Sequence, residues 1–96
     1  MRTIKYTNAF KRDYKREKSG KSRRHAERLD RELTEVVALL AADAALPRRY
    51  ADHALSGDWK DFRDCHIRPD LILIYRMPQA DSLELVRLGS HSELGL

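Results

Sequence analysis

The sequence has 96 residues, of which 42% are hydrophobic and 35% are charged, and its formal net charge is +4 at pH 7. This length and balance indicate a single domain over residues 1–96 with a modest core, and they exclude an intrinsically disordered chain. No apolar stretch is long enough for a membrane helix, and the amino terminus lacks the apolar core of a secretory signal. The single cysteine excludes an internal disulfide and a multi-cysteine zinc site. We therefore expect a cytoplasmic protein with no membrane association.

The charge is unevenly distributed along the chain. Residues 1–31 carry 12 Lys and Arg against 4 Asp and Glu, whereas residues 32–96 carry 7 against 11. The balance of +8 in the first third favours a polyanionic or acidic partner, with nucleic acid as the leading candidate. Two helices with solvated basic faces would give the same pattern, so charge alone leaves both interpretations open.

The first half of the chain predicts one strand and two helices. Residues 3–6 alternate weakly and indicate a short strand, after which Thr7 or Asn8 can cap a helix that ends near Gly20. A second helix is predicted from about Ser22. Its apolar residues recur at the helical period and form one stripe, made of Leu29, Leu33, Val36, Val37 and Leu40.

The second half predicts a loop followed by three strands. We expect Pro47 to stop the second helix, and the stretch that follows, to about residue 60, shows no sustained period. The strands are expected over residues 59–67, 71–76 and 83–88, and the middle one is apolar on both faces, as is typical of a central strand. The order β-α-α-β-β-β predicts an α+β fold, with two N-terminal helices packed on a small, mainly antiparallel sheet.

Titratable side chains gather where these strands begin. Asp64 and His66 lie two residues apart, so a strand places them on the same face, and Asp70 begins the neighbouring strand. His53 in the long loop and His91 just after the last strand bring two more imidazoles to loop–strand junctions. We expect the fold to gather these five side chains.

Such a set suits metal-free cleavage of RNA. Histidine can act as general base or general acid near neutrality, and a carboxylate can orient an imidazole and stabilise its charged form. Cations that could stabilise a crowded phosphate lie on or beside the strands, at Lys60, Arg63, Arg76 and Arg87. Each side chain could equally be an ordinary turn, surface or core residue, and the histidines and aspartates could hold a divalent ion. No compact metal motif such as H-E-x-x-H is present, so we expect neither a metal site nor a cofactor.

The stretch YADHALSGDWKDFRDCHIRPDLILIYR, residues 50–76, resembles the YafQ-like branch of the RelE superfamily of bacterial toxins. A D-H-x-L-x-G-x-W-x-x-x-R-D-x-H-x-x-P-D pattern recurs there before an apolar strand, and the likeness extends to the closing RLGSHSEL. The resemblance implies a RelE/YafQ-like toxin domain that acts as a ribosome-dependent, metal-independent endoribonuclease and cuts mRNA in the ribosomal A site. It also implies a cognate antitoxin, in a complex that can be heterotetrameric and that binds operator DNA through the antitoxin.

Carried over by position, the family's active-site histidines fall on His53, His66 and His91, with Asp64 and Asp70 as accompanying carboxylates. The resemblance implies proton transfer by His53 and His66. His91 would contact the scissile phosphate or supply the other proton, and Asp70 would support a histidine or contact RNA. Phosphate contacts are assigned to the cations Lys60, Arg63, Arg76 and Arg87, and the two basic helices would face ribosomal RNA.

One position departs from the family pattern. The family commonly carries an aromatic residue four positions after the last histidine, where Gly95 stands here with Leu94 and Leu96 beside it. This departure favours one alternative, a catalytically degenerate toxin that retains antitoxin binding and autoregulation. Independently of it, a second alternative stays open, a ParE-like member that acts on DNA gyrase. The three histidines argue against the second, because ParE-like relatives lack them.

Overall fold

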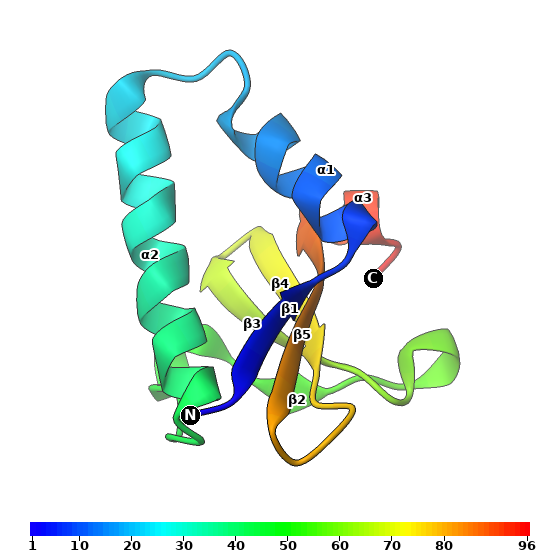
Figure 1. Cartoon of the computed structure of the whole chain (residues 1–96). Helices are drawn as coiled ribbons and strands as arrows, with labels where there is room; N and C mark the ends of the chain where they lie inside the picture. The colour runs from blue at the N-terminus through cyan, green and yellow to red at the C-terminus, as the bar shows by residue number, and fades with distance from the viewer.

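A five-stranded sheet organises the molecule, with its strands in the order β1-β5-β4-β3-β2 (Figure 1). In this computed structural model, which describes all residues from 1 to 96, the strands are β1 (Thr3–Tyr6), β2 (His53–Ala54), β3 (Arg63–Arg68), β4 (Leu71–Arg76) and β5 (Ser82–Gly89). β1 pairs parallel with β5, and every other neighbouring pair is antiparallel. The predicted α+β fold with a mainly antiparallel sheet is confirmed.

Two helices, α1 (Asn8–Lys18) and α2 (Arg23–Ala41), pack on one face of this sheet. The hydroxyl of Thr7 accepts a hydrogen bond from the Phe10 backbone N–H, and that of Ser22 accepts one from His25, so both helices begin at residues that the sequence indicated. The predicted apolar stripe of α2 is buried against the sheet apart from the half-buried Val37. Each fully buried Leu or Val contributes about 1.5–3 kcal/mol to folding.

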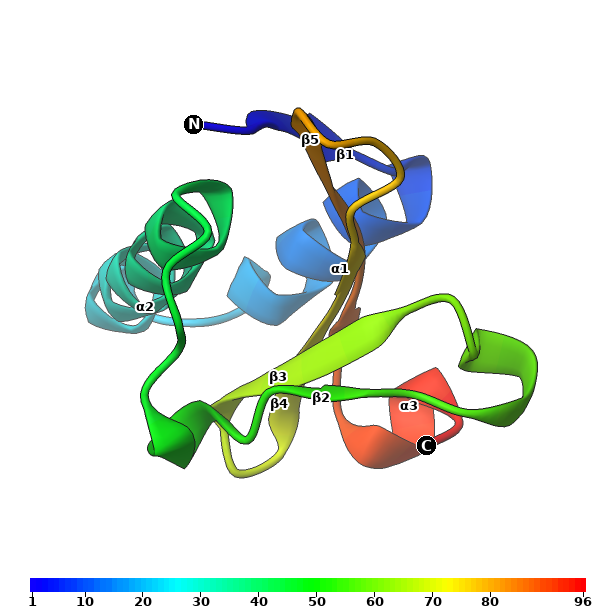
Figure 2. The ribbon, with the colours of Figure 1, turned by 90° about the horizontal axis from the view of Figure 1, so that it is seen from below.

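The central strand β4 is buried on both faces, as its composition predicted. Leu71, Leu73 and Tyr75 point toward the helices, whereas Ile72 and Ile74 point to the other face. There they pack with Leu94 of the short helix α3 (His91–Leu94) and with the half-buried Leu55, Trp59, Phe62 and Val86. Figure 2 shows α3 on the opposite side of the sheet from α2. The sheet therefore has a thick helical layer on one face and a thin, partly open layer on the other.

The second helix ends earlier than Pro47, at Ala41. Asp43 adopts a left-handed backbone with φ of 56°, and its carboxylate accepts a hydrogen bond from Arg2 Nε at 2.7 Å. Asp tolerates this conformation better than most residues, so the helix can end without proline. No helix in the structure combines the length and the hydropathy that crossing a membrane requires.

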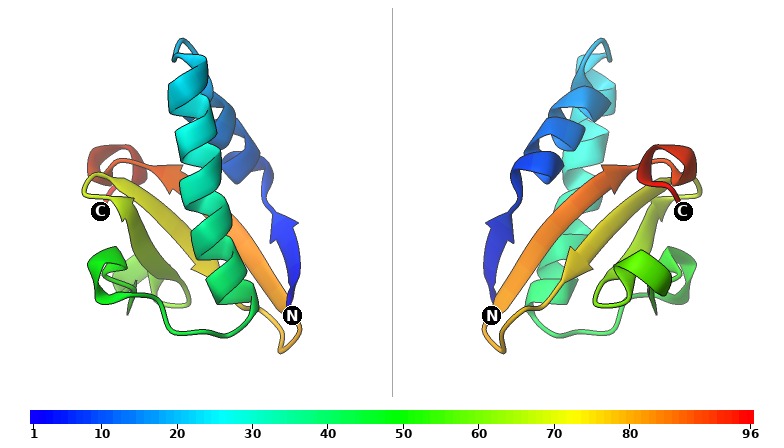
Figure 3. Two further views of the ribbon diagram at one scale, coloured as in Figure 1. Left: turned by 90° about the vertical axis from the view of Figure 1, so that its left-hand side faces the viewer. Right: turned by 90° about the vertical axis from the view of Figure 1, so that its right-hand side faces the viewer.

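Four short elements were not expected from the sequence, and one strand begins later than predicted. The predicted loop contains the 3-10 turns η1 (Arg48–Tyr50) and η2 (Gly57–Trp59) with β2 between them, and the helix α3 follows β5. The strand expected from residue 59 begins at Arg63, because Gly57, with φ of 64°, turns the chain into η2. Figure 3 shows β5 running from beside the start of β1 to α3, which places α3 at the far end of the sheet from the amino terminus.

Candidate active site

A hollow of about 450 Å³ on the thinly covered face of the sheet gathers three of the four histidines. β2 contributes His53, β3 contributes Asp64 and His66, and α3 contributes His91. The rest of the wall comes from η2, the loop before it and the last two residues, through Leu55, Ser56, Asp58, Trp59, Gly95 and Leu96. Of the five side chains that the fold was expected to gather, four line this hollow and Asp70 lies outside its wall.

Strand pairing sets the spacing of the imidazoles. His53 lies directly opposite Asp64 in the antiparallel pair β2–β3, and His66 is two residues further along the same face of β3. The ring centroids of His53 and His66 are 6.4 Å apart, and those of His66 and His91 are 5.3 Å apart. His66 thus neighbours both other rings, and one phosphate group is small enough to contact more than one of them.

The backbone fixes the tautomer of His53. Its Nδ1 lies 2.7 Å from the carbonyl oxygen of Ala51. A carbonyl oxygen only accepts hydrogen bonds, so Nδ1 carries the proton in the neutral ring and Nε2 keeps a free lone pair. Ala51 itself has a left-handed backbone with φ of 48°, a conformation that costs a non-glycine residue about 1–3 kcal/mol. Strain of this kind is typical of backbone that is held in place for function.

A carboxylate fixes His91 in the same way. Oδ1 of Asp70, in the turn between β3 and β4, accepts from the His91 backbone N–H at 3.0 Å and from Nδ1 at 2.7 Å. These two hydrogen bonds hold the pKa of Asp70 below its usual value, so its carboxyl is ionised near neutrality. Asp70 is exposed and lies outside the wall of the hollow. It therefore acts on the hollow through His91, whose Nε2 is left free.

Asp64 is a buried carboxylate beneath the imidazoles. The residue is 3% exposed, and its Oδ1 has no hydrogen-bond partner although it lies 3.1 Å from His53 Nδ1. Burial raises the pKa of Asp64, and the nearby His53, His66 and His91 oppose this shift. An uncompensated buried carboxylate favours positive charge on its neighbours. Asp64 is thus placed to stabilise a protonated imidazole.

The four candidate cations lie outside the wall of the hollow, and three of them are paired with carboxylates. Arg63 pairs with Asp52 at 3.3 Å, Arg76 with Glu84 at 2.6 Å, and Arg87 with Asp13 at 2.6 Å. Lys60, at the end of η2, makes no ion pair or side-chain hydrogen bond within the chain. Of the four cations, Lys60 is therefore the one that can bind a phosphate without first breaking an ion pair.

The pairing of Arg87 belongs to a buried network that holds the end of β5. Asp13 of α1 accepts hydrogen bonds from Arg87, Arg16 and the Leu88 backbone N–H. Burial alone would raise the pKa of Asp13, but these hydrogen bonds outweigh it and hold the pKa below the usual value. A Cβ at Gly89 would lie 3.0 Å from Arg16 Nη2, so glycine leaves room for the Arg16 guanidinium against the end of β5. The network thus positions the residues just before His91.

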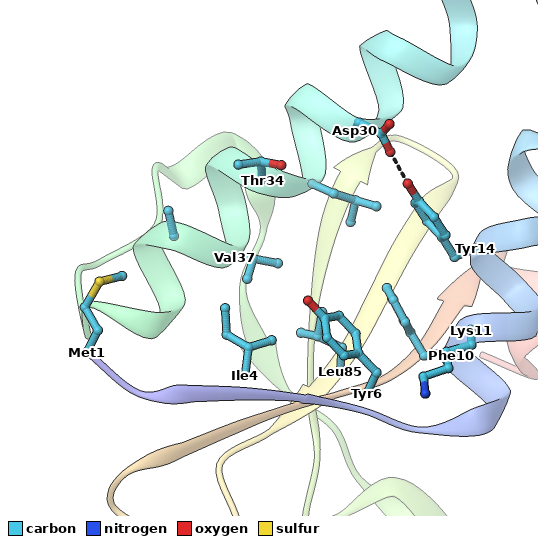
Figure 4. A pocket seen from close by; sticks show the side chains of 12 residues that line it. Met1, Ile4, Tyr6, Phe10, Lys11, Tyr14, Asp30, Thr34, Val37 and Leu85 are labelled. Atoms are coloured by element: carbon cyan, nitrogen blue, oxygen red, sulfur yellow. Dashed lines mark hydrogen bonds between the residues drawn. The ribbon is translucent and has the colours of Figure 1, made fainter. Parts of the chain in front are cut away.

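A larger hollow of about 810 Å³ lies on the other side of the molecule, between α1, α2 and β1 (Figure 4). Its wall is mostly apolar, and its polar edge includes the hydrogen bond from the Tyr14 hydroxyl to Asp30 (Figure 4). None of the histidines lines it. Because acid–base chemistry needs the imidazoles, the smaller hollow is the candidate active site. No group of three or more His, Cys, Asp and Glu side chains is arranged to hold a metal ion.

Sequence reasoning missed part of the wall. The sequence predicts irregular structure from Leu55 to Asp58 and indicates no role for Ser56 or Asp58, both of which line the hollow. The alternation of His53 and Leu55, two residues apart, is the signal that could have indicated β2 and the residues that follow it. Two residues are a short strand, which is why the pattern is weak.

The chain matches a family model described as a bacterial toxin of type II toxin-antitoxin system, YafQ, over residues 2–95. A relative from Escherichia coli strain B, named mRNA interferase toxin YafQ, is 35% identical over 95 residues, which cover 98% of this chain and 96% of the relative. For two further curated relatives named as YafQ toxins, the match spans only about half of each relative's length, 53% and 52%.

Solved structures of bacterial toxins are also similar to this chain. A copper-bound mutant toxin from Helicobacter pylori is similar with a TM-score of 0.82 at 40% identity, covering 98% of this chain and 99% of that one. A chain of the E. coli DinJ-YafQ complex is similar with a TM-score of 0.80 at 33% identity, covering 98% of both chains. Both likenesses cover nearly the whole chain and therefore include the sheet and the helices.

Proposed function

The chain belongs to the YafQ family of toxins from bacterial type II toxin–antitoxin systems, and we propose that it is a ribosome-dependent endoribonuclease that cleaves mRNA in the ribosomal A site. The name mRNA interferase toxin, carried by a relative that matches almost the whole chain, supports this activity. The observation that carries the proposal here is the hollow in which His53, His66 and His91 surround a buried carboxylate.

The reaction needs one group that accepts a proton and one that gives a proton. A base takes the proton of a ribose 2′-hydroxyl, and the 2′-oxygen attacks the adjacent phosphorus. The bond from phosphorus to the 5′-oxygen of the next nucleotide breaks, and an acid protonates that oxygen. The products are a 2′,3′-cyclic phosphate and a 5′-hydroxyl, so atoms and protons balance. Two imidazoles with free Nε2 atoms supply both roles near neutrality.

The hydrogen bonds of the site suggest how these roles divide. We assign the acid to His91, because the ionised Asp70 at 2.7 Å from Nδ1 stabilises the positive charge of a protonated ring. His53 is the base, because its Nδ1 proton is held by the Ala51 carbonyl and its Nε2 is free to accept. His66 neighbours both rings and contacts the phosphate. Asp64 stabilises whichever ring carries the proton.

Charge around the site comes from two sources. Lys60 is free to contact a phosphate, and Arg63, Arg76 and Arg87 would do so only by exchanging their carboxylate partners for it. Most of the Lys and Arg residues in the first third of the chain lie on α1 and α2, and none of them lines the hollow. This surface would face ribosomal RNA, because binding to a polyanion draws on clustered positive charge.

The proposed protein partner is a cognate antitoxin. The solved DinJ-YafQ complex of E. coli, one chain of which resembles this one, supports such a partner. The complex would neutralise the toxin and, as a heterotetramer, bind operator DNA through the antitoxin. The ribosome and mRNA are the remaining proposed partners, and we propose a cytoplasmic location on the ground that ribosomes and mRNA are found there.

A second candidate function rests on Gly95. A toxin without the terminal aromatic could bind its antitoxin without cleaving RNA. Gly95 ends α3 with φ of 70°, a conformation that suits glycine, so the departure also has a purely structural cause. None of the proton-transfer residues is missing, and the cleaving toxin is therefore the better supported function.

The proposal is tested by adding purified protein to a bacterial translation extract that synthesises a reporter. We expect reporter synthesis to stop and the reporter mRNA to be cut, and we expect purified antitoxin to prevent both. A folded protein that binds the antitoxin but leaves synthesis unchanged would overturn the nuclease and favour the non-cleaving toxin.

A further inference from the structure

The wall of the hollow combines two chemically different kinds of side chain. Beside the three imidazoles it contains the apolar side chains of Leu55, Trp59 and Leu96. Asp58, in the first turn of η2, adds a carboxylate to that wall. The volume of about 450 Å³ lies in the range of about 300–1,000 Å³ that is usual for small-molecule sites. There is room for more than the phosphate on which the imidazoles would act.

The carboxylate of Asp58 has no partner within the chain. The residue is exposed, and it makes no ion pair and no side-chain hydrogen bond, although Lys60 lies two residues away. A carboxylate in the wall of a site for RNA repels the phosphate backbone. The group on RNA that it attracts is instead an N–H donor on a base.

Trp59 contributes a flat and rigid aromatic ring to the wall of the hollow. Its ring meets that of Phe62 edge to face, at 5.2 Å between centroids and 82° between planes. The guanidinium of Arg76 lies over Phe62 at 5.4 Å from the ring centroid, so Phe62 is itself held in place. A base that lies against a fixed aromatic ring is stabilised by about 1–3 kcal/mol. Trp59 thus offers at η2 the aromatic contact that Gly95 cannot provide.

We propose that Asp58 and Trp59 form a subsite for a guanine base next to the scissile phosphate. The inference rests on the proposed RNA cleavage and names the base that the same site selects. Guanine presents two adjacent donors on its Watson–Crick edge, N1–H and N2–H, which match the two oxygens of one carboxylate. In uracil the single N–H lies between two carbonyl oxygens, and in adenine and cytosine the amino group lies beside a ring nitrogen that only accepts. Guanine is therefore the base that Asp58 binds through two hydrogen bonds without repulsion.

Binding of free nucleotides tests the subsite without ribosomes. The probes are 3′-GMP and 5′-GMP, each compared with the matching uridine nucleotide, and binding is followed by NMR titration of the Trp59 indole N–H signal. For the wild type we expect at least one guanine nucleotide to bind about tenfold more tightly than its uridine counterpart, as one bidentate pair with a base provides. Asp58→Asn should bring the two affinities together.

Asp61→Asn is the matched control, because Asp61 is an exposed carboxylate three residues further on that does not line the hollow. It should keep the wild-type preference for guanine. Equal affinities in the wild type, no binding of either nucleotide, or an unchanged preference in Asp58→Asn would overturn the subsite. If the protein binds guanine nucleotides preferentially but leaves the mRNA in the translation extract intact, the proposed cleavage is wrong and the guanine subsite stands.

Discussion

His91 and Asp70 are joined twice, because one carboxylate oxygen of Asp70 accepts from both the backbone N–H and the ring Nδ1 of His91. The pair connects the turn between β3 and β4 to the first residue of α3. It fixes the position of the helix start and the tautomer of the ring at the same time. The candidate acid is thus oriented by a residue that the hollow itself does not contain.

Replacing Asp70 by Asn should lower cleavage while leaving the fold intact. Asn keeps the shape but loses the charge that stabilises protonated His91, so we expect the cleavage rate to fall by about 10²-fold, the lower end for a lost acid–base contribution. Single-turnover cleavage on programmed ribosomes measures this rate, with Asp81→Asn as an exposed control. An unchanged rate in Asp70→Asn would remove Asp70 from the mechanism.

Asp64 should limit stability at neutral pH. Folding raises the pKa of Asp64, so the protonated carboxyl favours the folded state. This contribution to the free energy of unfolding is complete below the pKa of the unfolded chain, about 3.9, and is lost as the pH rises through the pKa of the folded protein. At pH 7 the buried charge therefore destabilises the fold. We expect Asp64→Asn to gain about 1 kcal/mol in urea unfolding at pH 7 while its cleavage activity falls. A variant that is less stable than the wild type and cleaves normally would contradict both the destabilising effect of the buried charge and the role of Asp64 in stabilising a protonated imidazole.

Asp13 should behave in the opposite way. Folding lowers the pKa of Asp13, so the ionised carboxylate favours the folded state. This contribution to the free energy of unfolding is complete above the pKa of the unfolded chain, about 3.9, and is lost as the pH falls through the pKa of the folded protein. Because Asp13→Asn leaves Arg87 and Arg16 without their shared carboxylate, we expect a loss of about 3–5 kcal/mol at pH 7. Urea unfolding at pH 7 and at pH 3 checks this, and the difference between variant and wild type should shrink at the lower pH. A difference that is the same at both pH values would show that the charge of Asp13 is not the cause.

Substitutions at Gly95 should cost stability through the backbone alone. A Cβ there would meet no atom within 4 Å, but φ is 70°. We therefore expect Gly95→Ala and Gly95→Phe to lose the same amount, about 1–2 kcal/mol. Thermal unfolding measures both variants. A loss confined to the Phe variant would instead point to crowding around α3.

Removing metal ions should leave cleavage unchanged. The proposed reaction moves protons between imidazoles and RNA and involves no metal ligand. Protein treated with excess chelator and returned to ribosomes in their usual Mg²⁺ should cleave at the rate of untreated protein. A loss that one added transition-metal ion restores would contradict the acid–base mechanism.

Much of the fold could be predicted from local patterns. The stripe from Leu29 to Leu40 and the two-faced apolar run of β4 reflect periods that burial requires, and Thr7 and Ser22 mark helix starts through hydrogen bonds within one turn. The end of α2 could not be predicted in this way. It depends on Asp43 and its distant partner Arg2, a contact that has no local signal.

The site follows the same division. The proximity of Asp64 and His66 was predicted from strand period, but their distances to His53 and His91 depend on β2 and α3, which are too short to show a period. Arg87 and Asp13 form an ion pair although they are far apart in the chain. The sequence therefore identified Arg87 as a cation but could not show that a carboxylate already neutralises it. Asp58 carries no signal in the sequence, because it joins the wall of the hollow only through the fold of η2.

Primer extension on a reporter mRNA tests most directly whether the histidines of this hollow cleave mRNA on the ribosome. Wild-type protein and His66→Ala are compared in a translating extract and on naked mRNA, after circular dichroism has shown that both proteins are folded. We predict cuts by the wild type at codon-phased positions, with none from His66→Ala and none without ribosomes. Equal cleavage by both proteins, or no cleavage by the folded wild type, would contradict the proposed cleavage by these histidines.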